Sequence, residues 1–66
     1  MNASSSTQTV TGALTFETVP DLYRSSSSWF EGAGELILDL AQVERTDSAG
    51  LALLIEWLRR AQAANR

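Results

Sequence analysis

The sequence predicts a single α/β domain, because strand-like and helix-like segments alternate along its 66 residues. The strand candidates 8–14 and 35–40 are each followed by apolar residues at helical spacing, in 15–30 and 47–64 respectively. Residues 1–7 are small and polar, and we expect them to form a disordered tail ahead of the domain.

The first predicted strand carries β-branched residues in loose alternation, and Gly12 within it indicates a bulge or a close backbone approach. The following segment, 15–30, is expected to be a helix that Thr15 or Thr18 caps. One face of this helix collects its apolar residues together with one serine: Val19, Leu22, Tyr23, Ser26, Trp29 and Phe30. The serine run 25–28 is interpreted as a weakly specified surface face, and its phosphorylation is the less favoured alternative.

The second predicted strand, 35–40, is aliphatic at four of its six positions, and Ile37 lies opposite the three leucines. A strand that is apolar on both faces is typical of a parallel sheet covered on both sides. Residues 41–46 are expected to be a loop, and the last helix has a wide apolar face: Leu51, Leu53, Leu54, Ile55, Trp57, Leu58 and Ala61. We expect this face to pack on the sheet, with Trp29 and Trp57 as core aromatics that could instead reach a partner.

Composition excludes several classes of function. The 8 acidic and 5 basic residues leave a net charge of −3, which argues against a nucleic-acid partner. Without Cys or His there is no thiolate or imidazole site, so we expect no cofactor and no metal, assign no catalytic residue and regard an enzyme as least favoured. The sequence has no secretory signal and its longest apolar run, 51–55, cannot span a bilayer, so we expect a cytoplasmic protein without direct membrane insertion.

The turn from Asp47 to Gly50 is the one place where the residues suggest a site. Ser48 is predicted to lie where the last helix begins, among backbone N–H groups that lack intrahelical partners and favour an anion such as phosphate. Asp47 can cap the helix or orient the Ser48 hydroxyl, and Gly50 can allow another backbone or a partner to approach. Plain capping and a phosphorylation switch both remain open here. Asp39 and Asp47 alone are poor evidence for a metal site.

The segment from Glu35 to Leu54 resembles the core signature of STAS domains, the anti-anti-sigma factor-like modules. In both, an apolar strand ending in Asp-Leu is followed by a short loop and by Asp-Ser/Thr-small-Gly-Leu opening a helix. The stretch from Gly12 to Pro20 is similar to the family's first strand and helix, and the resemblance covers about residues 8–64. It implies a β-α-β-α STAS core over residues 8–66. Because family members continue further, this domain is expected to be incomplete on its C-terminal side, completed by a partner, or marginally stable.

The resemblance implies a non-enzymatic module that binds a protein. Residues 14–20 and 47–61 are more similar to the small STAS subunit of Mla-type phospholipid ABC transporters, which binds the cytoplasmic ATPase subunit and would be held at the inner membrane through it. The alternative is an anti-anti-sigma factor, in which phosphorylation of Ser48 by a partner kinase ends binding to that partner. The expected partner-binding residues are Arg45, Thr46, Asp47, Ser48, Ala49, Gly50 and Leu51.

Overall fold

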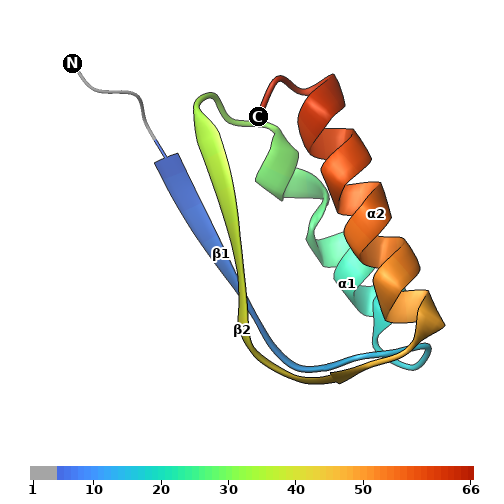
Figure 1. Ribbon diagram of the computed structural model, residues 1–66. Coiled ribbons are helices and arrows are strands. Elements are labelled where there is room, and N and C mark those ends of the chain that lie inside the picture. The colour runs from blue at the N-terminus through green and yellow to red at the C-terminus, as the bar shows by residue number, and fades with distance from the viewer. Residues whose placement is uncertain (1–4) are drawn as a thin grey trace.

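The computed structural model describes residues 5–66, which form two strands and two α-helices in the predicted alternating order. In chain order the elements are β1 (Ser5–Leu14), α1 (Val19–Ser25), the 3-10 helix η1 (Ser27–Phe30), β2 (Glu35–Thr46) and α2 (Ser48–Ala63). The strands pair in parallel, and Figure 1 shows the helices lying together on one side of the curved ribbon that the strands form. The predicted α/β class is confirmed.

The two strands are longer than the sequence predicts. β1 pairs with β2 from Ser5–Glu35 to Leu14–Thr46, so residues 5–7 of the predicted tail belong to the sheet, and residues 1–4 lie outside the described residues. The prediction of a loop at 41–46 is wrong, because backbone pairing with β1 makes these residues the second half of β2.

The bulge expected at Gly12 is confirmed. The register shifts between Thr9 and Thr11 and again between Gly12 and Ala13, and Gly12 adopts a φ of 78°. This left-handed conformation is unfavourable for residues that carry a Cβ, so glycine suits the position. The irregular pairing accompanies the bend that brings the ends of both strands toward the start of α2 (Figure 1).

The core lies between the inner face of the sheet and the helices. Its buried hydrophobic residues come from β1 and α2: Val10, Leu14, Leu53 and Trp57. Partly buried hydrophobic residues pack around them: Val19, Leu22, Trp29, Phe30, Leu38, Val43 and Leu54. Trp57 is completely buried and its ring centroid lies 5.1 Å from that of Trp29. The expected core role of Trp57 is therefore confirmed, with Trp29 packed against it.

The predicted helix over 15–30 is divided into α1 and η1 at Ser26. The hydroxyls of Ser25, Ser26 and Ser27 donate to the carbonyls of Leu22, Tyr23 and Arg24, three residues earlier. Such bonds compete with a regular helical ladder. The interpretation of the run as a surface face is wrong for Ser26, which is completely buried.

The start of α1 also differs in detail from the sequence-based expectation. Thr18 occupies the N-cap position, but its hydroxyl donates to the carbonyl of Ala13, 2.8 Å away, and makes no side-chain cap to the helix. The Thr18 hydroxyl also accepts the N–H of Thr15 at 2.9 Å. Thr18 therefore closes the turn between β1 and α1 instead of capping the helix.

The outer face of the sheet is not covered by residues 5–66. Ile37 is 43% exposed, and alternate residues of β1 on this side are hydroxylated and exposed: Ser5, Thr7, Thr9 and Thr11. The sequence-based expectation of a sheet covered on both sides is thus wrong for the described residues. The alternation of polar and buried residues in β1 fits a sheet with one solvated face. The aliphatic residues of 35–40 do not by themselves indicate this solvated face.

Candidate functional site

The turn between β2 and α2 has the capped geometry that the sequence predicts. Asp47 is extended, with φ −128° and ψ −168°, and α2 begins at the next residue, Ser48. One carboxylate oxygen of Asp47, Oδ1, accepts the N–H of Gly50 at 3.1 Å. This bond satisfies one of the free amides at the helix start, so Asp47 is confirmed as an N-cap residue.

The second oxygen of Asp47 ties the turn to a distant part of the chain. Oδ2 accepts the backbone N–H of Phe16 at 3.0 Å, and the N–H of Asp47 donates to the carbonyl of Leu14 at 3.3 Å. The N–H of Phe16, followed by that of Gly50, lowers the pKa of Asp47 because these bonds favour its charged form. A single carboxylate thus joins the ends of both strands to the first turn of α2.

Ser48 is exposed at the first position of α2, a helix of 16 residues. Its hydroxyl is accessible to solvent beside the helix N-terminus, where the helix dipole favours negative charge. The structure therefore leaves Ser48 reachable by another protein. The N–H of Gly50 is already bonded to Asp47, so capping does not require the Ser48 hydroxyl. Capping and modification do not exclude each other here, because they use different side chains.

Gly50 lies beneath this surface. It is buried, and a Cβ at this position would collide with the carbonyl oxygen of Leu14 and the hydroxyl oxygen of Thr46. Its missing side chain lets the first turn of α2 approach the end of β1, so the predicted close approach of another backbone is confirmed, and the space is not left for a partner. Any contribution of Gly50 to binding is therefore indirect.

The predicted partner-binding residues are brought to one end of the molecule but differ in accessibility. Ala49 is half-buried, and the other residues of the set besides Gly50 are exposed: Arg45, Thr46, Asp47, Ser48 and Leu51. Leu51 begins an exposed apolar row on α2 that continues with Ile55 and Leu58, each more than half exposed. The sequence-based assignment of Leu51, Ile55 and Leu58 to a face packed on the sheet is therefore wrong. The interior instead takes Leu53 and Trp57.

Sequence reasoning missed Phe16 as a residue of this end of the molecule. It lines a hollow of about 310 Å³ together with residues of the turn after β1, the end of β2 and the residue that follows β2: Thr15, Glu17, Arg45, Thr46 and Asp47. The available signal was an aromatic residue that lies outside the apolar face of the helix predicted over 15–30. No local pattern shows that this turn reaches Asp47.

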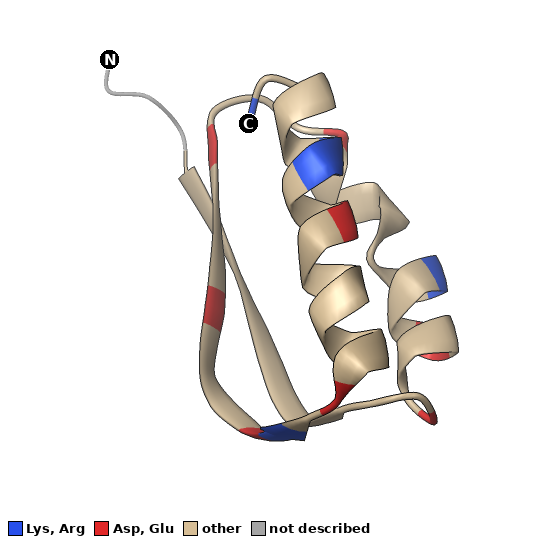
Figure 2. Cartoon of the chain, turned by 45° about the vertical axis from the view of Figure 1, so that its right-hand side comes forward, with Lys and Arg blue, Asp and Glu red and all other residues tan. Residues whose placement is uncertain are grey.

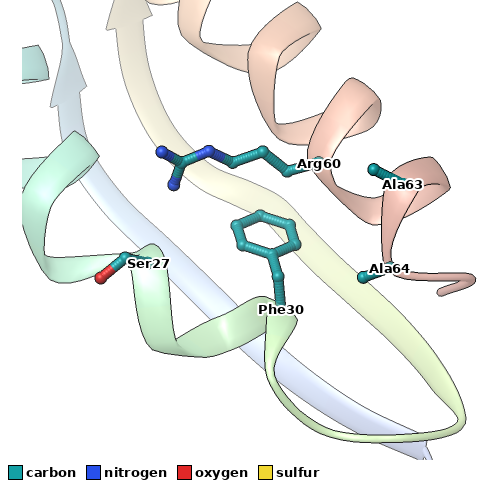
Figure 3. A pocket seen from close by; sticks show the side chains of 5 residues that line it. All are labelled: Ser27, Phe30, Arg60, Ala63 and Ala64. Carbon is teal, nitrogen blue, oxygen red and sulfur yellow. The ribbon is translucent and has the colours of Figure 1, made fainter.

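A second hollow, of about 410 Å³, is lined by residues of η1 and the C-terminal half of α2 (Figure 3). Its charged group is Arg60, whose guanidinium carbon lies 4.4 Å from the ring centroid of Tyr23 and whose Nε is 3.5 Å from Glu56. Arg60 is thus engaged by an aromatic face and a carboxylate of its own chain. This arrangement fits a packing role for Arg60.

The carboxylates of the two aspartates considered for a metal site both accept hydrogen bonds from backbone N–H groups. Asp39 accepts the N–H of Ala41 at 3.0 Å, and Asp47 accepts those of Phe16 and Gly50. Within residues 5–66 there is no group of three or more side chains of the kinds that ligate metals. In this same part of the chain no helix is both long and apolar enough to cross a bilayer.

Comparison with known families defines the class of protein. The family model described as "Mlab, STAS domain" matches residues 1–66, and the chain belongs to this family. STAS domains are generally non-enzymatic modules that bind protein partners, and the β-α-β-α core agrees with this family. Searches of curated proteins and of solved structures find no match.

Proposed function

We propose that the chain is the small STAS subunit of a Mla-type phospholipid ABC transporter, held at the inner membrane by docking on the cytoplasmic ATPase subunit. The description of the matching family supports this choice of system. The docking surface consists of the exposed residues at the start of α2 and the apolar row that follows them: Arg45, Thr46, Asp47, Ser48, Leu51, Ile55 and Leu58.

The exposed row on α2 is the observation that carries the proposal. Ser48, Leu51, Ile55 and Leu58 are spaced by three or four residues, so they share one side of the helix. Removing apolar surface from water contributes roughly 25 cal/mol per Å². An apolar row that starts at an accessible hydroxyl suits a protein interface with a small polar group at its margin.

Binding of the purified ATPase subunit to wild-type and variant chains tests this surface. We expect Ile55→Ser to weaken binding at least tenfold, because it places a polar group at the centre of the row, and Ser48→Glu to weaken it as well. Ile37→Ser is the matched control, since Ile37 is also exposed but lies on the outer face of the sheet. Equal binding by Ile55→Ser and Ile37→Ser would show that the row is not the docking surface.

The second candidate function is an anti-anti-sigma factor switched by phosphorylation of Ser48. It is supported by the exposed position of this hydroxyl at the start of α2. Phosphate would add a charge of about −1.5 to −2 beside the Asp47 carboxylate. This charge would be repelled by an acidic partner surface and would lose its hydration against an apolar one. Intact-mass analysis after incubation with the cognate kinase should show one added phosphate that Ser48→Ala abolishes. An unmodified chain beside an active kinase rejects this function.

A further inference from the structure

Phe16 is the most exposed of the large hydrophobic residues in the described chain, with 77% of its surface accessible to solvent. It lies between β1 and α1, at the end of the molecule where α2 begins. Aromatic side chains are enriched in the central contacts of protein interfaces, because they bury a large area with few rotatable bonds. Phe16 therefore has the chemistry of an interface anchor.

The backbone of Phe16 is held in place from two sides. Its N–H donates to Oδ2 of Asp47 at 3.0 Å, and the carbonyl of Thr15 accepts the N–H groups of Thr18 and Val19 at 2.9 and 2.8 Å. The Thr18 hydroxyl closes the same turn through the N–H of Thr15. A side chain presented from a fixed backbone loses less entropy when it binds, which favours a role in recognition.

The charges around Phe16 indicate the kind of surface that it meets. The hollow beside it is lined by two carboxylates, Glu17 and Asp47, and by one guanidinium, Arg45. Figure 2 shows acidic residues on several of the segments that converge at this end, and the whole chain carries a net charge of −3. A basic rim on the partner would complement this surface, whereas an acidic rim would be repelled.

We propose that Phe16 inserts into an apolar pocket of the protein partner and that lysine or arginine residues rim this pocket. The inference rests on the proposed function, in which the ATPase subunit supplies the pocket. Asp47 then has two structural tasks, because the same carboxylate caps α2 and positions the turn that carries the anchor.

Binding of the ATPase subunit at low and high salt provides the first test. We expect Phe16→Ala to weaken binding at least tenfold while its melting temperature stays near that of the wild type, because the side chain is exposed. Ile37→Ala is the matched control and should bind normally. Wild-type affinity should fall as salt rises, and Glu17→Gln should reduce this dependence. Normal binding by Phe16→Ala overturns the inference while leaving the proposed function standing.

Photo-crosslinking in cells tests the inference without assuming the partner. Position 16 carries p-benzoylphenylalanine in place of Phe16, and position 37 carries it in the control chain. We expect crosslinks from position 16 alone, to a peptide whose apolar residues lie beside Lys or Arg on the partner's surface. If the ATPase subunit fails to bind the wild-type chain, the proposed function falls and this crosslink still decides the inference. Equal yields at both positions, no crosslink, attachment to lipid, or attachment to a site without basic residues each overturns it.

Discussion

The indole N–H of Trp57 donates a hydrogen bond to the Ser26 hydroxyl oxygen at 2.8 Å, and both residues are completely buried. The two residues are 31 positions apart, so the bond joins α2 to the break between α1 and η1. The Ser26 hydroxyl in turn donates to the carbonyl of Tyr23 at 3.1 Å. Buried polar groups are tolerated when they are paired, and this short chain of bonds satisfies the indole.

Replacing Ser26 should therefore destabilise the fold. Ser26→Ala leaves the indole N–H of Trp57 buried without its acceptor, which costs about 1–3 kcal/mol. Urea unfolding followed by tryptophan fluorescence measures this loss. Ser28→Ala changes an exposed serine of the same run and should alter stability by less than about 0.5 kcal/mol. Equal midpoints for the two variants would show that the buried hydrogen bond contributes little.

Gly50→Ala should destabilise the chain because the new methyl group would meet the carbonyl of Leu14 at the end of β1. Displacing this backbone or the start of α2 is expected to cost about 1–3 kcal/mol, as overpacking does elsewhere. Gly32→Ala is the matched control, since its Cβ would lie 3.2 Å from its nearest neighbour, a nitrogen of the Arg66 guanidinium, and no backbone atom is among its three nearest neighbours. Thermal melts followed by circular dichroism compare the two, and a larger loss in Gly32→Ala would contradict the proposed close approach.

The lowered pKa of Asp47 predicts a specific pH dependence. A carboxylate whose pKa is lower in the folded chain stabilises the fold above its unfolded value of about 3.9, and this stabilisation disappears as pH falls through the folded value. Stability should thus decrease on acidification below about pH 4. Asp47→Asn should reduce this decrease, because an amide still accepts one N–H but carries no charge to lose. Thermal melts of the wild type, Asp47→Asn and the control Glu31→Gln, recorded from pH 7 down into the acid range, test this. An unchanged acid profile in Asp47→Asn argues against the effect.

Arg66 should stabilise the end of the domain opposite the Ser48 turn. Asn65 has a positive φ of 61° after α2, and the Arg66 guanidinium donates to the carbonyls of Gly34 at 3.0 Å and of Trp29, and to the Ser6 hydroxyl at 2.9 Å. Arg66→Ala removes all of these bonds and is expected to cost about 1–3 kcal/mol.

A matched substitution on α2 provides the control for Arg66. Arg59 is exposed and lies 3.9 Å from Glu56, a pairing of the kind that contributes about 0.2–1 kcal/mol. Arg59→Ala should therefore have the smaller effect in urea unfolding. If both variants unfold at the same urea concentration, the Arg66 guanidinium does not hold the chain end as described.

Much of the local structure could be predicted because its causes are local. The helix start at Ser48, with Asp47 as its cap, follows from residue types within a few positions. The bulge at Gly12 follows in the same way.

The position of Phe16 beside Asp47 and the hydrogen bond between Ser26 and Trp57 could not be predicted. Each contact joins residues 31 positions apart, and nothing in the nearby sequence specifies the partner. The strand character of residues 41–46 also depends on β1, because pairing with another strand supplies the backbone hydrogen bonds that an isolated strand lacks.

The sequence by itself determined the alternation of strands and helices, the capped start of the last helix and the resemblance to STAS domains. These features depend on periodicity, capping and motif spacing, which act over short distances along the chain. The tertiary structure alone decided which apolar residues of α2 are buried and which form the exposed row. It also decided that one carboxylate serves both the helix start and the turn carrying Phe16, because only folding brings the ends of the two strands together.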